Sequence, residues 1–307
     1  MSDISFLEGG FDNEVAKYRR YSNRKTGFDN LDDEQIFMPG LYVLGGLPGA
    51  GKTTFALQLL YKLALRGEPC FYLSFEMSEF SLWAKVLARE LFARHFKENP
   101  KKPEPALSAT SLMRGHGVGN GEIYDLKREL ARLKLPLKIA QVDYRTKNLT
   151  QALPRVEGAV VVLDYLQMMA HDKEKKRGAI DEMIFSFREY QRRYNATLII
   201  LSAFNRESYK FQASMASFKE SGGIEYTADV CWALQAYGAD YEAMREESGK
   251  LVRRIRLTCL KNRFGGQYTA DFYYYAAHDY FRPNVGDPFE EQVKTSADNA
   301  PQRKHRK

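Results

Sequence analysis

Short apolar runs alternate along most of the chain with longer segments of helical periodicity. Runs such as 41–44 and 160–163 are apolar at every position, which is typical of strands buried on both faces of a sheet. Segments such as 78–97 and 121–133 place apolar residues three and four positions apart, which predicts helices. The order predicts an α/β fold with a mostly parallel central sheet flanked by helices. Because the last connections are short, antiparallel strands are expected at the carboxyl-terminal end. Strands are expected at 41–44, 70–75, 137–142, 160–164, 197–202, 229–234, 251–260 and 268–275.

A turn rich in Gly and Pro follows the first of these strands and contains Gly46-x-x-x-x-Gly51-Lys52-Thr53. With a strand before it and a helix after it, this is the pattern of a phosphate-binding P-loop. Glycines let successive backbone N–H groups point at one anion, and the positive end of the helix adds to the attraction. We expect Lys52 to reach the phosphates and the Thr53 hydroxyl to bind Mg²⁺. The other expected nucleotide contacts are Gly46, Pro48, Gly49, Ala50, Gly51 and Thr54.

Polar residues at the ends of the other strands are the next candidates, because ligands bind at the carboxyl ends of parallel strands. Asp164 ends an apolar strand and either coordinates Mg²⁺ or caps the chain locally. Glu76 follows the second strand and either activates a water molecule as a general base or helps to cap the next helix. Ser202 either senses the terminal phosphate or is an ordinary hydroxyl at a strand end.

Composition bounds the organisation of the chain. Its 307 residues are 44% hydrophobic, enough for a folded core. We expect an amino-terminal arm at 1–40 with a short helix near 13–21, a core domain at 41–285, and a polar, basic tail at 286–307 that is disordered. Four basic residues of the arm are expected to form a solvated face: Arg19, Arg20, Arg24 and Lys25.

The net charge of +7 favours a polyanionic partner such as nucleic acid, although many basic proteins bind none. The three cysteines lie far apart, which suits a reducing compartment better than disulfides. No signal peptide or membrane-spanning run is evident, so the expected location is the cytoplasm, without a membrane partner.

Several motifs together resemble a known family. The P-loop is followed in order by the segments 73–78 (LSFEMS), 163–168 (LDYLQM), 201–206 (LSAFNR), 219–229 (KESGGIEYTAD) and 261–266 (KNRFGG). From about residue 26 to 284 the chain resembles the motor domain of DnaB-type hexameric replicative helicases, a RecA-like P-loop NTPase. The 219–229 segment is the most specific of these motifs, because P-loop kinases and GTPases lack it.

The resemblance implies that ATP and Mg²⁺ bind at the P-loop, that Asp164 supports the metal and that Glu76 activates water. It also implies that Lys261 and Arg263 reach the nucleotide of a neighbouring subunit. From the residues alone, Lys261 and Arg263 would be a solvated basic pair.

The resemblance further implies a homo-oligomeric ring, expected to be a hexamer, around single-stranded DNA. A primase or a loader is a candidate partner. The residues expected to contact DNA are Lys219, Glu220, Gly222 and Arg206.

The chain departs from the family pattern in places. Ala203 stands where the family usually has Gln, and Lys219 where it has Arg. Only about 40 residues precede the motor, too few for the family's helical collar, so any exchange of segments between subunits would use the helix near 13–21. The favoured hypothesis is a ring-forming motor that translocates on single-stranded DNA and unwinds duplex DNA. Two alternatives are a RecA-like ATPase switch that is no helicase, and an ATP-assembled DNA-binding clamp or adaptor.

Overall fold

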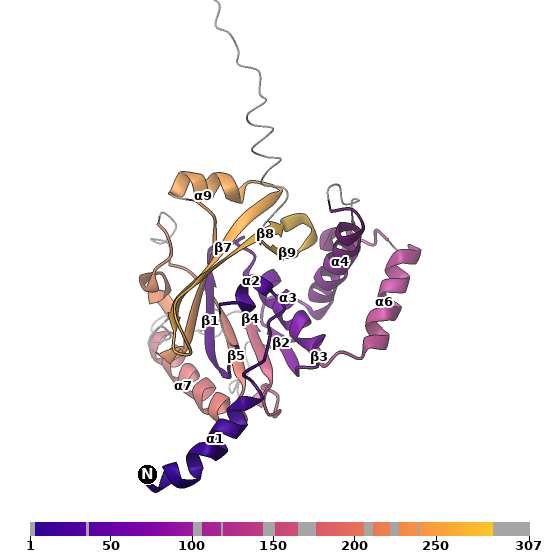
Figure 1. Ribbon diagram of the computed structural model, residues 1–307. Coiled ribbons are helices and arrows are strands. Elements are labelled where there is room, and N and C mark those ends of the chain that lie inside the picture. Colours follow the sequence, from indigo (N-terminus) through magenta and orange to yellow (C-terminus); the bar gives the residue numbers. More distant parts are fainter. Residues whose placement is uncertain are drawn as a thin grey trace, which may run out of the picture.

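One mixed sheet runs through the molecule (Figure 1). The computed structural model describes residues 4–34, 37–100, 106–117, 119–143, 151–164, 176–205, 211–221, 227–238 and 240–284. Within these ranges nine strands follow the order β3-β2-β4-β5-β1-β6-β7-β8-β9. The strands are β1 (Gly40–Gly46), β2 (Cys70–Ser74), β3 (Leu137–Gln141), β4 (Val160–Asp164), β5 (Thr197–Ala203), β6 (Val230–Ala236), β7 (Val252–Asn262), β8 (Thr269–Tyr275) and β9 (Tyr280–Pro283).

The strands from β3 to β6 pair in parallel, and those from β6 to β9 pair antiparallel. This confirms the predicted fold class. The helices are α1 (Gly10–Arg19), α2 (Asp29–Asp32), α3 (Lys52–Ala64), α4 (Glu79–Glu98), α5 (Ala109–Met113), α6 (Gly121–Leu133), α7 (Lys176–Tyr194) and α9 (Tyr241–Ser248), with 3-10 turns η1 (Ile4–Glu8), η5 (Met215–Ser221) and η6 (Ala276–His278).

Strand β1 lies between β5 and β6 and is buried along its whole length. Its side chains alternate between two hydrophobic clusters, because successive residues of a strand point to opposite faces. Tyr42 and Leu44 belong to the cluster that contains α3, and Leu41 and Val43 to the cluster that contains α7. The sheet is therefore covered on both faces, and β1 holds a fixed position at its centre.

Helix α9 was not predicted from the sequence. Of its eight residues only Met244 and Glu247 are buried, too few to give a periodic apolar pattern. The helix begins at a local cap, where Asp240 accepts a hydrogen bond from the backbone N–H of Ala243 at 2.9 Å.

Part of the amino-terminal segment is packed into the core. Phe28 and Phe37 have no exposed surface. Arg24 is also buried, and it donates hydrogen bonds to the Gly158 carbonyl at 2.9 Å and to Glu68 at 2.6 Å. The expectation of a solvated basic face is thus wrong for Arg24, because that side chain donates to two buried acceptors, the Gly158 carbonyl and the Thr197 hydroxyl. It is confirmed for Arg19, Arg20 and Lys25, which are exposed.

Each helix in the described part of the chain is too short or too polar to span a bilayer.

Arg24 generates a stability prediction. Replacing it with Ala leaves the Gly158 carbonyl and the Thr197 hydroxyl without their buried donor, so we expect a loss of about 2–4 kcal/mol in the free energy of unfolding. The control Arg19→Ala, at an exposed position of α1, should change it by less than about 0.5 kcal/mol. Urea unfolding measures both, and equal values for the two variants would contradict the anchoring role.

Candidate functional site

The turn between β1 and α3 has the backbone that its glycines allow. Gly49 and Gly51 have φ of +78° and +91°, in the left-handed region that side chains disfavour. A Cβ on Gly51 would lie 2.8 Å from Cζ of Phe281 on β9, so the turn runs directly over that ring. Only glycine satisfies both conditions at position 51.

Lys52 folds back over this turn. Its Nζ donates to the carbonyl oxygens of Gly46 at 2.8 Å and Leu47 at 3.0 Å. Burial lowers the pKa of Lys52 to about 8, although Asp164 and Glu76 favour the charged form. An ammonium group beside a turn that opens a helix is an arrangement that binds phosphate.

Asp164 ends β4 and lies next to the start of α3. The Thr53 hydroxyl donates to its Oδ2 at 2.8 Å, and the Tyr72 hydroxyl donates to the same oxygen at 2.6 Å. Burial raises the pKa of Asp164, while these two bonds and the charge of Lys52 oppose the rise. A carboxylate and a hydroxyl this close together are the oxygen ligands that Mg²⁺ prefers, so the residues fit that ion.

Tyr72 is a site residue that sequence reasoning missed. It lies on β2, the strand paired with β4, and its whole side chain is buried. The signal that could have found it is a hydroxyl in the middle of an apolar strand beside the strand that ends in Asp164.

The register of the parallel strands brings most of the predicted residues to one edge of the sheet. Ser202 on β5 lies opposite Gly45 on β1 and is buried. Glu76 follows β2 by two residues and is exposed. The hydroxyl of Thr54 instead donates to Asp279 at 2.9 Å, so that side chain ties α3 to the carboxyl-terminal hairpin.

A cavity of about 410 Å³ opens beside the turn, a size typical of small-molecule sites. One wall is the turn itself, and the other is α9 with parts of β6 and β7. Arg253 on β7 closes the cavity toward the turn by donating to the Gly49 carbonyl at 3.1 Å. The lining residues are Leu47, Pro48, Gly49, Ala50, Gln235, Ala236, Tyr241, Met244, Arg245, Ser248, Arg253 and Ile255.

Lys261 and Arg263 lie at the opposite end of the sheet. The Arg263 backbone N–H donates to the carbonyl of Asp229 at 2.9 Å, and Asp229 bonds the first residues of β1. The seven residues of β1 put roughly 20 Å between that end and the turn. The structure therefore does not join Lys261 and Arg263 to the phosphate-binding residues of the same chain.

Of the residues predicted to contact DNA, the structure places the backbone of Lys219 and Glu220 in η5. Gly222 and Arg206 lie outside the described residues.

Comparison with known proteins gives one family. A model of the DnaB-like helicase C-terminal domain matches residues 24–283. The fold is similar to the ATPase domain of a protein called G40P, with a TM-score of 0.67 and 18% identity over 92% of this chain and 99% of that one. It is also similar to a DnaB-like replicative helicase whose structure concerns its interactions with primase, with a TM-score of 0.67 and 17% identity over 92% of this chain and 68% of that one. At these identities the two structures establish the fold alone. A search of the curated proteins found no match.

The lowered pKa of Lys52 predicts how ligand binding depends on pH. Because Lys52 is charged below pH 8 and loses its proton as the pH rises through 8, the affinity for a triphosphate should be highest below pH 8 and fall toward pH 9.5. Titration of a fluorescent ATP analogue across this range measures the effect. Lys52→Arg keeps its charge throughout, so its affinity should be flatter with pH. An equal slope in both proteins would assign the dependence to another group.

Proposed function

The chain belongs to the family of DnaB-like helicase C-terminal domains, and we propose that it is the ATP-hydrolysing motor of a ring that translocates along single-stranded DNA and unwinds duplex DNA. The observation that carries the proposal is the separation of two half-sites in one subunit. The phosphate-binding turn lies at one end of β1, and the basic residues Lys261 and Arg263 lie at the other. Neither half is complete alone.

Several residues of the turn and its neighbours serve the nucleotide in this proposal. Lys52 binds the phosphates, and Thr53 with Asp164 holds Mg²⁺, which draws charge from the phosphate oxygens. Tyr72 and Thr53 orient the Asp164 carboxylate through their hydrogen bonds. Glu76, which is exposed, accepts the proton of the attacking water.

The second half-site acts on the next subunit. Because Arg263 lies roughly 20 Å from the turn of its own chain, its guanidinium can stabilise the charge developing on a γ-phosphate only across an interface. When the patch at one end of a subunit meets the different patch at the opposite end of its neighbour, the contact is head-to-tail. Such contacts generate rings when the rotation closes. ATP hydrolysis then requires assembly.

The other residues expected to form the site serve DNA binding in this proposal. We propose that Lys219, Glu220, Gly222 and Arg206 contact the single-strand backbone, which needs charge and backbone amides and no base readout. The net charge of +7 supports a polyanionic partner. A primase or loader fits the same proposal as a further partner, in line with the similarity to a helicase studied with primase.

Helix α1 supports assembly. It projects away from the sheet (Figure 1), and its apolar residues Phe11, Val15 and Tyr18 are 51%, 48% and 38% exposed. Their spacing of four and three positions places them on one face of the helix. A second copy of the chain would bury this face.

The central test is steady-state ATP hydrolysis with and without single-stranded DNA, at modest salt because backbone contacts weaken with ionic strength. We expect DNA to stimulate hydrolysis and ATP to drive unwinding of a forked duplex, and Lys52→Ala to lack both activities. Strong hydrolysis that DNA does not change would favour the ATPase switch. Hydrolysis as slow as that of Glu76→Gln, with ATP-dependent DNA binding, would favour the clamp.

A second prediction concerns α1. Phe11→Asp with Val15→Asp puts charge on the exposed apolar face, so we expect the protein to shift from an oligomer toward a monomer in sedimentation analysis. Asn13→Asp, on the same helix and also exposed, is the control and should leave the distribution unchanged. If the double variant assembles as the parent does, the face serves another purpose.

A further inference from the structure

We propose that Asp229 is the positioning residue for Arg263, and that it sets the direction in which this guanidinium meets the nucleotide of a neighbouring copy. The inference rests on the proposed function, because it assumes that Arg263 acts across an interface. It adds a residue that does not itself touch the nucleotide.

The Asp229 carboxylate joins three parts of the fold. Its Oδ2 accepts the backbone N–H of Leu41, at the start of β1, at 2.8 Å. Arg188 of α7 donates to both oxygens, from Nη1 to Oδ2 at 2.5 Å and from Nη2 to Oδ1 at 3.1 Å. Arg263 Nη1 bonds Oδ1 at 3.1 Å. One carboxylate thus binds two guanidinium groups and the central strand. These four hydrogen bonds use all four acceptor positions of the carboxylate.

The two guanidinium groups differ in exposure. The Arg188 side chain is 14% exposed, and it also donates to the carbonyl of Thr227, so it is a fixed part of the interior. The Arg263 side chain is 52% exposed, while that of Asp229 is 9% exposed. The largely buried Arg188 therefore holds the Asp229 carboxylate in place, and the side chain of Arg263 extends from that carboxylate toward solvent. Bidentate pairs of this kind fix geometry as well as charge.

The turn that carries Arg263 is braced on the same side. The ring of Phe264 lies over Gly40, where a Cβ would be 2.8 Å from its Cζ and 3.0 Å from Oδ2 of Asp229. Asn262 closes the turn by accepting the backbone N–H of Phe264 at 3.0 Å and donating to the Gly266 carbonyl at 2.9 Å. Glycine at position 40 is what lets both groups approach β1.

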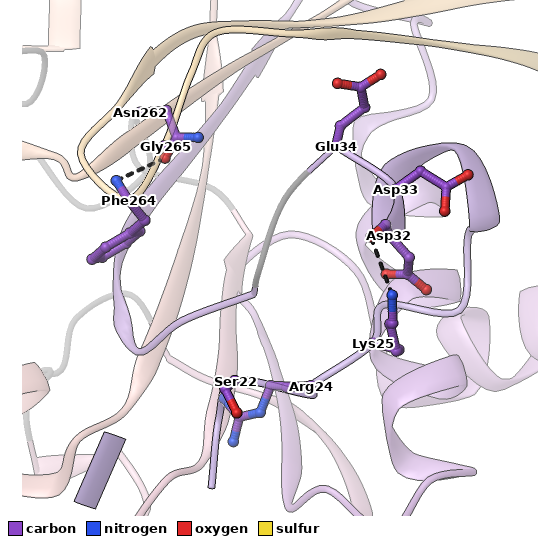
Figure 2. Close-up of a pocket in the computed structure, with 9 residues that line it drawn as sticks. All are labelled: Ser22, Arg24, Lys25, Asp32, Asp33, Glu34, Asn262, Phe264 and Gly265. Atoms are coloured by element: carbon purple, nitrogen blue, oxygen red, sulfur yellow. Dashed lines mark hydrogen bonds between the residues drawn. The ribbon is translucent and has the colours of Figure 1, made fainter. Parts of the chain in front are cut away.

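The other side of the turn borders open space. A polar pocket of about 310 Å³ lies between the turn and the amino-terminal segment, and Figure 2 shows the side chains that line it. Asn262, Phe264 and Gly265 form one wall, and the opposite wall includes Asp32 and Glu34. Because the described residues leave a pocket on that side, the contacts described above that hold the turn lie on the Asp229 side, and we infer that they help to fix where it points.

The first experiment compares Asp229→Asn with Arg263→Ala. Asn keeps an oxygen for the Leu41 N–H and removes the charge that binds Arg263. We expect kcat for DNA-stimulated ATP hydrolysis to fall roughly 10- to 100-fold, the scale of a misplaced catalytic group. Arg263→Ala should lose roughly 10³-fold or more, the scale of removing an arginine finger. The affinity for an ATP analogue should not change in either variant, because the phosphate-binding turn lies at the other end of β1.

The matched control is Asp271→Asn. Asp271 forms a bidentate pair with Arg256 of β7 at 2.7 Å to each oxygen, so the substitution removes the same charge from a bidentate pair that is more exposed and does not touch Arg263. Its kcat should equal that of the parent protein. Thermal melting checks that each variant is folded. If Asp229→Asn does not fold, Asp229→Glu keeps the charge and shifts the carboxylate by one methylene, and it should show the same loss of kcat.

Mixed assemblies separate a positioning role from a structural one. Asp229→Asn subunits retain an intact phosphate-binding turn, and Glu76→Gln subunits retain an intact Arg263. In a random equal mixture about a quarter of the interfaces pair the two intact halves, as head-to-tail contacts require. Hydrolysis by the mixture should therefore rise well above that of either variant alone, and the same should hold for Arg263→Ala mixed with Glu76→Gln.

The outcomes are distinguishable. A kcat for Asp229→Asn that is unchanged or raised overturns the inference, as does recovery with Arg263→Ala but not with Asp229→Asn. If Arg263→Ala hydrolyses ATP normally, or if its hydrolysis does not rise on mixing with Glu76→Gln, then the proposal that Arg263 acts across an interface is wrong. The part of the proposed function that depends on it, and this inference, then fail together.

Discussion

Burial of the central strand β1 is the constraint on which the rest of the structure depends. Its side chains fill both hydrophobic clusters, so neither end of the strand can move relative to the sheet without opening the core. The glycine-rich turn that contains Gly49 and Gly51 continues from one end, and Asp229 bonds Leu41 at the other. The strand has a fixed length, which keeps Lys52 and Arg263 apart within one chain.

Two buried carboxylates lie near the two ends of β1. Asp164 accepts hydrogen bonds from Thr53 and Tyr72, and Asp229 accepts from Leu41 and two arginines. A buried carboxylate is costly unless its oxygens are satisfied. The two differ in what satisfies them. The side chains that donate to Asp164 are neutral hydroxyls, which leave its negative charge available to a cation, whereas two guanidinium groups pair with Asp229.

The antiparallel strands β7, β8 and β9 give the subunit its asymmetry. They extend the sheet beyond β6 and carry Arg263 to the end of the sheet opposite the turn. They also return to the turn between β1 and α3, where the ring of Phe281 lies under Gly51 and Arg253 bonds the Gly49 carbonyl. One hairpin region thus contributes to the surroundings of both the turn and Arg263.

Much of the fold could be predicted because its signals are local. The all-apolar runs and the spacing of apolar residues identified the strands from β1 to β8, and the P-loop pattern identified the turn. Local signals did not identify α9, which has few buried residues, or the burial of Arg24, whose partners are distant in sequence. The same holds for Tyr72, whose hydroxyl meets Asp164 only because β2 pairs with β4.

The sequence by itself determined which residue types are available to bind a phosphate or a metal ion, or to act as a cationic side chain across an interface. It also determined the order in which they occur. The tertiary structure decided which of them meet. The order of the strands places Asp164, Ser202 and the turn at one edge, and it sends Arg263 to the other, where it binds Asp229. The periodicity of apolar residues in a sequence reports only local structure, over one or two turns of a helix or a few residues of a strand. Contacts between residues 34 or 111 positions apart, such as Asp229 with Arg263 and Thr53 with Asp164, depend on how the whole sheet is assembled.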